Sequence, residues 1–189
     1  GEYLTRVQCY NAFGSIYGFR YKGVYSYSNY IEGVQENAPV ARDANGDVIL
    51  DSKGNTLPMY FAYGTSASYT FKGGDAIYED VNHDGNINEL DIVYLGNSNP
   101  ILTGGFGFKF NYKQFSLNSQ FNYRFGNKIV NKARMNAENM YSHNNQTYTI
   151  NWRWRKEGDG ANGEPVIPRA LYQTGYNWLA SDRYVEDGA

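Results

Sequence analysis

The stretch GFGFKFNYKQFSLNSQFNYRF, residues 105–125, decides the fold class of this chain of 189 residues. On both sides of Lys113-Gln114, large apolar side chains alternate with glycine or polar side chains. Such a period of two indicates a β-strand, because successive side chains of a strand point to opposite faces. We therefore predict a β-hairpin over 100–126, with its turn at Lys113-Gln114, one apolar face and one polar face.

The length of the two arms favours a membrane location. Each arm has roughly ten residues, which is the length that a tilted strand needs to cross a bilayer. A strand of a soluble sandwich shows the same alternation but is usually shorter. The pattern thus predicts two neighbouring strands of a transmembrane barrel wall with the aromatic face outward. A soluble β-module remains the alternative.

The composition agrees with an all-β fold. Aromatic residues make up 17% of the chain, 19 residues are Tyr and 21 are Gly. Tyr, Phe and Gly increase together where strands are many and turns are tight, and membrane barrels carry aromatic girdles. The expected fold is all-β: antiparallel strands and hairpins of a partial transmembrane β-barrel, with long extracellular loops and one short helix.

The rest of the chain is divided around the hairpin. Alternation in residues 1–27 predicts further barrel strands. Residues 28–99 lack long alternation, and we expect a long extracellular loop excursion there. Residues 127–189 predict a second long extracellular loop region, with a short helix inside Lys128–Tyr141, where Gly and Pro are absent. Loops of this length are usually functional or disordered.

Residues 80–91, DVNHDGNINELD, match the pattern of a calcium-binding loop. Polar side chains alternate at its start, and Gly85 stands where such a loop turns sharply. Calcium prefers six to eight oxygen ligands, and this spacing wraps oxygens around one point. The predicted ligands are Asp80, Asn82, Asp84, Asn86, Asn88 and Asp91. Asn86 would contribute its backbone carbonyl, and Asn88 would act through water.

The end of this loop differs from that of an intracellular calcium sensor. Asp91 stands where a bidentate Glu is usual, and no long amphipathic helix precedes Asp80. We therefore expect a structural Ca²⁺ site that holds an extracellular loop, with a solvated Asp/Asn/Gly turn as the alternative. Asp43–Asp47 and Asp51–Asn55 carry fewer candidate ligands and predict plain turns on either side of the short strand Val48–Leu50.

Aromatic residues near the end of the chain are candidates for ligand binding. They are Trp152, Trp154, Tyr172, Tyr176 and Trp178. Aromatic rings stack on sugar rings, but the same residues would also serve as loop packing or as an interfacial belt. The sequence alone leaves both interpretations open.

Several function classes lack support in the sequence. The net charge is -2, whereas nucleic-acid binding usually needs a basic excess, so no nucleic-acid partner is expected. Cys9 is the single cysteine, so an internal disulfide is excluded. We find no zinc spacing, paired catalytic carboxylates, nucleophile elbow or phosphate loop, and we predict that the chain is not an enzyme.

Four segments together resemble one known family. They are GFRYKGVY (18–25), GDAIYED (74–80), LGNSNP (95–100) and SDRYVEDG (181–188). In order and spacing the chain is similar to the C-terminal barrel part of the SusC/RagA-like TonB-dependent transporters of Bacteroidetes-type outer membranes. We therefore expect it to be a fragment of such a barrel.

The resemblance implies a location and a set of partners. The full protein would sit in the cell outer membrane and import glycans, peptides or other large nutrients. A SusD-like surface lipoprotein would form a lid, and TonB would supply energy through a plug region that this chain lacks. The alternative function is a soluble calcium-dependent carbohydrate-binding or adhesive β-module.

Overall fold

The computed structural model describes residues 12–25, 39–63, 66–141, 145–156, 158–159, 166–171 and 174–188. Strands dominate it. They are β1 (Ser15–Gly18), β2 (Tyr21–Val24), β3 (Tyr60–Tyr63), β4 (Ser66–Thr70), β5 (Ala76–Tyr78), β6 (Asn86–Ile87), β7 (Val93–Asn97), β8 (Leu102–Tyr112), β9 (Phe115–Phe125), β10 (Lys128–Val130) and β11 (Val185–Asp187). The all-β prediction is confirmed, while residues 1–11 and 26–27 of the predicted barrel-strand region lie outside the described residues.

Helical structure is minor. The described ranges contain one α-helix, α1 (Lys132–Glu138), which confirms the short helix predicted inside Lys128–Tyr141. Its first turn is capped by Asn131, whose side-chain oxygen accepts the N–H of Arg134 at 2.9 Å. Short 3-10 turns are η2 (Glu89–Asp91), η3 (Tyr148–Trp152), η4 (Tyr176–Trp178) and η5 (Asp182–Tyr184). Within the described ranges, no helix has the length and apolar character needed to span a membrane.

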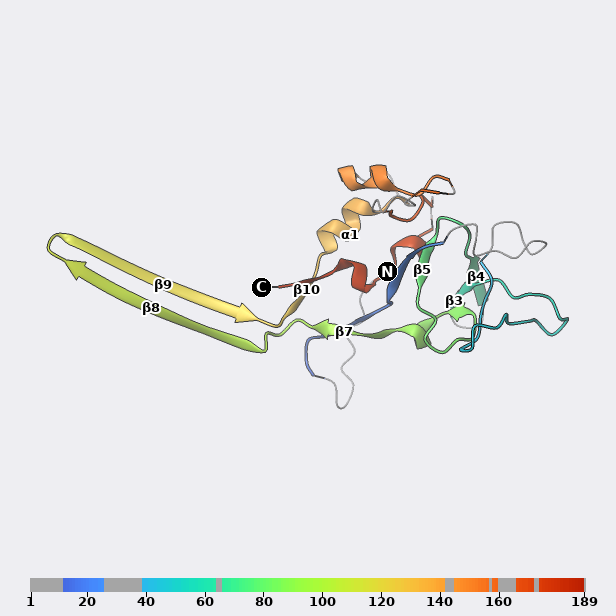
Figure 1. Cartoon of the computed structure of the whole chain (residues 1–189), viewed down its shortest axis with the longest axis horizontal. Helices are drawn as coiled ribbons and strands as arrows, with labels where there is room; N and C mark the ends of the chain where they lie inside the picture. Colours follow the sequence, from blue (N-terminus) through green and yellow to red (C-terminus); the bar gives the residue numbers. More distant parts are fainter. Residues whose placement is uncertain are drawn as a thin grey trace.

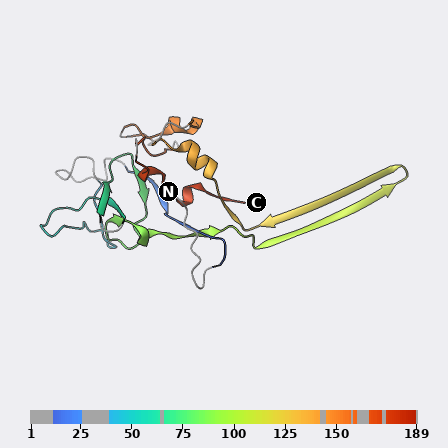
Figure 2. The same cartoon turned by 180° about the vertical axis from the view of Figure 1, so that it is seen from behind.

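The β8–β9 hairpin is a long ribbon that projects from the rest of the molecule (Figures 1 and 2). Its two strands have 11 residues each and pair in register from Leu102↔Phe125 to Tyr112↔Phe115. The turn at Lys113-Gln114 joins them, so the predicted hairpin and its turn are confirmed. The remaining described residues form a folded body at the end of the hairpin opposite its turn.

The hairpin has one apolar face and one polar face. The register places Phe106 opposite Phe121, and their rings stack with centroids 5.0 Å apart. The adjacent positions, such as Lys109 opposite Asn118, carry the polar side chains of the other face. Among the described residues, nothing shields the apolar face, and Phe106 is 61% exposed.

The body consists of short strand pairs instead of long strands. β1 pairs with β7, β2 with β5 and β10 with β11, and β4-β3-β6 form a small sheet. Within residues 1–27, where we predict barrel strands, the described part has the two short strands β1 and β2 of four residues each. Both pairings shift register, and Gly23 has a φ of 127°, which breaks regular strand geometry.

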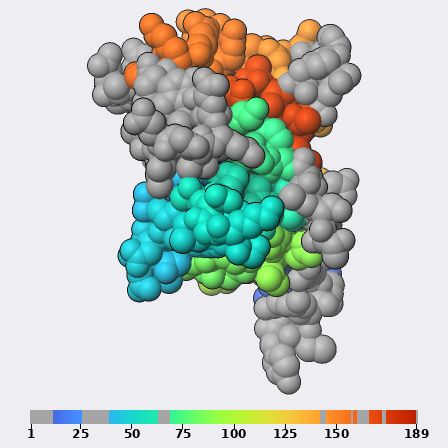
Figure 3. Space-filling model, turned by 90° about the vertical axis from the view of Figure 1, so that its right-hand side faces the viewer, coloured from blue at the N-terminus to red at the C-terminus, as the bar shows by residue number. Residues whose placement is uncertain are grey.

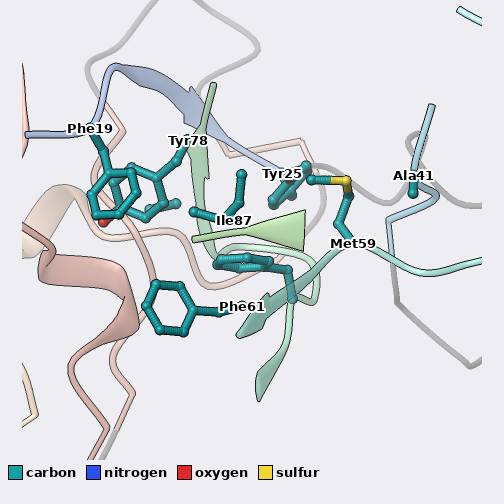
Figure 4. Close-up of a cluster of buried hydrophobic side chains, with 9 residues drawn as sticks. Phe19, Tyr25, Ala41, Met59, Phe61, Tyr78 and Ile87 are labelled. Atoms are coloured by element: carbon teal, nitrogen blue, oxygen red, sulfur yellow. The ribbon is translucent and has the colours of Figure 1, made fainter. Parts of the chain in front are cut away.

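The main core of the body is rich in aromatic side chains (Figure 4). Its buried members are Phe19, Tyr25, Ala41, Met59, Phe61, Phe71, Ala76, Tyr78 and Ile87. Burying one such large apolar side chain contributes about 1.5–3 kcal/mol relative to leaving it exposed. Because these residues come from segments between 19 and 87, and Tyr21 and Tyr69 pack against them, this core joins β2 through β6 into one unit.

A second core joins the C-terminal segments to the first. Its buried members are Met140, Ile167, Trp178 and Tyr184. Backbone hydrogen bonds tie the two regions together: Phe19 N–H donates to the Ala180 carbonyl at 2.9 Å, and Asp182 N–H donates to the Phe19 carbonyl at 3.1 Å. The two predicted loop regions, 28–99 and 127–189, thus contribute to a single folded body.

Candidate functional site

The 80–91 loop turns sharply around the carboxylate of Asp80. Its Oδ1 accepts the N–H of Asp84 at 3.2 Å, and its Oδ2 accepts the N–H of Gly85 at 2.7 Å. The turn passes through His83 with a φ of 57° and Gly85 with a φ of 81°, values that L side chains rarely adopt. Glycine is therefore the residue that this turn requires at position 85.

Asp91 closes the loop from its other end. Its Oδ1 accepts the N–H of Val81 at 2.8 Å, and its Oδ2 accepts the N–H of Asn88 at 2.9 Å. The side-chain oxygen of Asn88 accepts the N–H of Leu90 at 2.7 Å, which completes a capping box on η2. The fully buried Asp91 carboxylate thereby joins the start of the loop to its end.

The loop gathers negative charge around Asp91. Burial raises the pKa of the Asp91 carboxyl, and the negative charges of Asp80 and Asp84 raise it further, against the lowering effect of the N–H groups that it accepts. The negative charge of Asp91 is therefore disfavoured both by its burial and by the charges of Asp80 and Asp84. A divalent cation in the loop would relieve this repulsion.

The loop also retains oxygen atoms for such a cation. Within the described residues, no three His, Cys, Asp or Glu side chains converge as a ready metal centre. Each loop carboxylate uses its oxygens to accept N–H groups, yet a carboxylate offers about four lone-pair positions. In addition, Asn86 Oδ1 and Glu89 Oε2 are buried without a hydrogen-bond partner. The loop residues thus include oxygen donors of the kind that a hard cation prefers.

The aromatic residues predicted as ligand-binding candidates differ in how deeply they are buried. Trp154 and Trp178 are buried, which favours packing within the body over sugar stacking. Trp178 lies in the second core, and Trp154 packs over Gly74. Tyr176 is half-buried and stacks on Tyr69 at 4.7 Å between centroids.

Trp152 is the member of the predicted set that remains available on the surface. It is 41% exposed on η3, and Tyr172 lies outside the described residues. Its neighbour Tyr148, which the sequence analysis did not select, is 75% exposed and meets Trp152 edge-on at 5.8 Å. Ile150, between them, packs against the second core, so η3 presents both rings outward.

A buried polar network was also missed by sequence reasoning. Asp75 is fully buried and accepts the Arg169 Nε–H at 2.7 Å and the Tyr69 hydroxyl at 2.7 Å. The Asn177 side-chain amide donates to the same carboxylate at 3.1 Å. These hydrogen bonds satisfy the buried charge and connect segments about a hundred residues apart, which gives the network a structural role.

Comparison with known proteins gives two relatives. TonB-dependent receptor P39 of Formosa agariphila is 30% identical over 120 residues, which cover 61% of this chain and 12% of that protein. TonB-dependent receptor P3 of the same organism is 28% identical over 120 residues, covering 64% of this chain and 9% of that protein. The chain is related to TonB-dependent receptors. No protein-family model matches it.

The relationship supports part of what the sequence resemblance implied. Both relatives are named TonB-dependent receptors, which agrees with the resemblance at this coarser level. The chain spans about a tenth of the length of these relatives, so the activity of the whole protein is a matter for proposal.

Proposed function

We propose that this chain is part of a SusC-like TonB-dependent transporter of the outer membrane, and that it contributes two strands of the barrel wall and a folded extracellular body. The β8–β9 hairpin carries this proposal. Each strand has 11 residues, which is about 36 Å of extended chain. At a tilt of about 45° this chain rises about 25 Å, the height of the apolar band of a membrane barrel.

The faces of the hairpin match a barrel wall. Barrel strands alternate between apolar side chains toward lipid and polar side chains toward the lumen. A soluble module would need a second sheet over the apolar face, and within the described ranges Phe106, Phe110 and Phe121 are 61%, 59% and 47% exposed. Lipid is therefore the covering that we favour over the soluble carbohydrate-binding alternative.

The two ends of the hairpin indicate its orientation. Outer-membrane barrels have short turns on the periplasmic side and long loops outside the cell. The far end of the hairpin is the short Lys113-Gln114 turn, whereas the near end leads into the body. The body thus lies outside the cell, where it is placed to contact a SusD-like lid lipoprotein and a glycan or other large nutrient. TonB would act through a plug region elsewhere in the whole protein.

The exposed Tyr148–Trp152 pair is the part of the body best suited to stack on a sugar ring. Both rings lie on η3, where Tyr148 is 75% and Trp152 41% exposed. Aromatic side chains offer large rigid apolar surfaces at low conformational cost. This pair is accordingly the place at which we expect a glycan to touch the described surface.

A pair of lysine substitutions tests the barrel proposal. Phe108 lies on the apolar face and Gln120 on the polar face, near the middle of the hairpin. Phe108→Lys should destabilise the folded state in lipid vesicles by about 2–4 kcal/mol, because it places a charge at mid-membrane depth. Gln120→Lys should have little effect, since its side chain faces the lumen. The measurement is denaturant titration of the transporter that contains this chain; equal effects of both variants would refute the proposed orientation of the faces.

We also propose that the 80–91 loop binds Ca²⁺ as a structural cofactor. The buried Asn86 side-chain oxygen without a hydrogen-bond partner and the negative charges of Asp80 and Asp84 acting on Asp91 support this proposal. Extracellular calcium is abundant, so a site with a dissociation constant on the order of 10⁻⁴–10⁻³ M would be occupied there.

Calorimetric titration with CaCl₂ tests the metal proposal. The parent chain should release or absorb binding heat, and Asp80→Ala combined with Asp84→Ala should abolish it. Glu186→Ala combined with Asp187→Ala is the matched control, because these two exposed carboxylates lie on β11, outside both the loop and residues 39–59. Absence of heat in the parent up to millimolar calcium, with a folded body, would rule out the site.

A further inference from the structure

Residues 39–59 form a three-cornered arm beside the calcium loop. Ala41 N–H donates to the Leu57 carbonyl at 2.8 Å, Leu57 N–H to the Ile49 carbonyl at 2.9 Å, and Ile49 N–H to the Ala41 carbonyl at 3.0 Å. These three hydrogen bonds close a ring, so the arm has corners at Ala41, Ile49 and Leu57. The arm is the blue-to-cyan segment of Figure 1, and Figure 3 shows it in cyan on one face of the body.

The two turns between the corners have the same construction. Asp43 and Asp51 each accept backbone N–H groups from the residues two and four positions later, at 2.8–2.9 Å. Gly46 and Gly54 follow with φ values of 90° and 83°. Local side-chain hydrogen bonds therefore hold the exposed part of the arm in shape. The predicted plain turns at these two positions are confirmed.

The three corners meet at the tight turn of the calcium loop. A Cβ placed on Gly85 would lie 2.6 Å from Ala41 Cβ, 3.3 Å from Leu57 Cδ2 and 3.5 Å from Ile49 Cδ1. The corner side chains thus cover Gly85, which is itself buried. The three atoms nearest to this position therefore all belong to the arm corners.

The segment just after Gly85 is held by the strand that continues the arm. β3 follows the arm directly and pairs in parallel with β6, so that Tyr60 lies opposite Asn86 and Phe61 opposite Ile87. Ile87 is fully buried in the main core. Residues 85–87 are therefore held between the arm corners and β3. The carboxylates of Asp80 and Asp84 belong to the residues just before this segment.

We propose that Ala41, Ile49 and Leu57 are positioning residues for the calcium site. By covering Gly85 they fix the turn that places Asp80, Asp84 and the Asn86 carbonyl around one point. Ion binding and docking of the arm are then coupled, and each must favour the other by the same factor. This inference rests on the proposed calcium site and adds the support on which its affinity depends.

Two measurements on the whole chain test the coupling. The first is hydrogen exchange of the Ala41, Ile49 and Leu57 amides, which calcium should slow in the unmodified protein. The second is calcium affinity by calorimetry. Ile49→Ala should weaken binding about fivefold or more, at the lower end of typical coupling factors. Leu50→Ala is the matched control: Leu50 is the next residue but is 58% exposed, and its loss should leave the affinity within about twofold.

The outcomes separate the two proposals. No calcium heat in the unmodified chain would refute the metal site itself. Calcium binding with unchanged exchange at the three corner amides would overturn the coupling and leave the metal site intact. The exchange measurement needs no substitution, so it decides the question even if Ile49→Ala does not fold. Equal affinities of the Ile49→Ala and unmodified chains would count against the coupling in the same way.

Discussion

At the scale of single residues, Gly74 and Gly54 share a backbone conformation but differ in surroundings. Both have a φ of 83°. A Cβ at Gly74 would lie 2.2 Å from Trp154 Cε3, whereas a Cβ at Gly54 would meet nothing within 4 Å. Gly74 is therefore required both by the backbone and by the buried ring that packs on it, and Gly54 by the backbone alone.

Alanine substitution at these glycines separates the two requirements. Gly54→Ala should lower the free energy of unfolding by about 1–2 kcal/mol, the cost of a left-handed conformation for an L side chain. Gly74→Ala should lower it by about 2–5 kcal/mol, since overpacking of the buried Trp154 adds about 1–3 kcal/mol. Denaturant unfolding of the chain in detergent measures both. Equal losses would show that Trp154 moves aside freely.

At the scale of elements, the hairpin combines strong internal pairing with faces that need other partners. All residues of β8 and β9 are paired in register, yet a two-stranded hairpin in water is marginal on its own. Cross-strand side-chain pairs on the apolar face then become an important local stabilisation. Phe106 and Phe121 are such a pair, with stacked rings.

A double-mutant cycle measures this cross-strand interaction. We expect Phe106→Leu and Phe121→Leu to show a coupling of about 0.5–1.5 kcal/mol in the free energy of unfolding, the usual value for an aromatic pair. Thr103→Ala and Arg124→Ala provide the matched control on the polar face, where these residues are also opposite each other. A coupling near zero for the two rings would mean that lipid or detergent separates them.

At the scale of the whole molecule, buried charge connects distant parts of the body. Arg169 and Asp75 are 94 positions apart, and their side chains form the centre of the network with Tyr69 and Asn177. Because Asp75 is fully buried, removing its partner leaves an uncompensated charge. The integrity of the body thus depends on this contact between its two loop regions.

Arg169→Met should therefore destabilise the entire body. Breaking a buried pair costs about 3–5 kcal/mol, and the partial exposure of Arg169 places the expected loss in unfolding free energy at the lower end. Arg20→Met is the control, because Arg20 pairs with Glu79 on the surface, where such pairs contribute about 0–1 kcal/mol. If the two variants lost the same stability, the network would not join the two regions energetically.

The sequence by itself determined the features that depend on neighbouring residues. The period of two over 102–125 predicted the hairpin, because side-chain direction alternates in any strand. Aspartate and glycine spacing predicted the turns at 43–47 and 51–55 and marked the 80–91 loop, because Asp side chains accept N–H groups a few residues away. The family resemblance also came from the sequence, and the two relatives support it at the level of TonB-dependent receptors.

Only the tertiary structure decided which distant residues meet. The burial of Trp154 and Trp178, the pairing of Asp75 with Arg169 and the cover of Gly85 by the arm leave no periodic signal in the sequence. The sequence likewise did not predict that β1 pairs with β7 while β2 pairs with β5. In each case the stabilisation comes from excluding water between segments far apart in the chain, and this depends on how the whole body folds and not on local spacing.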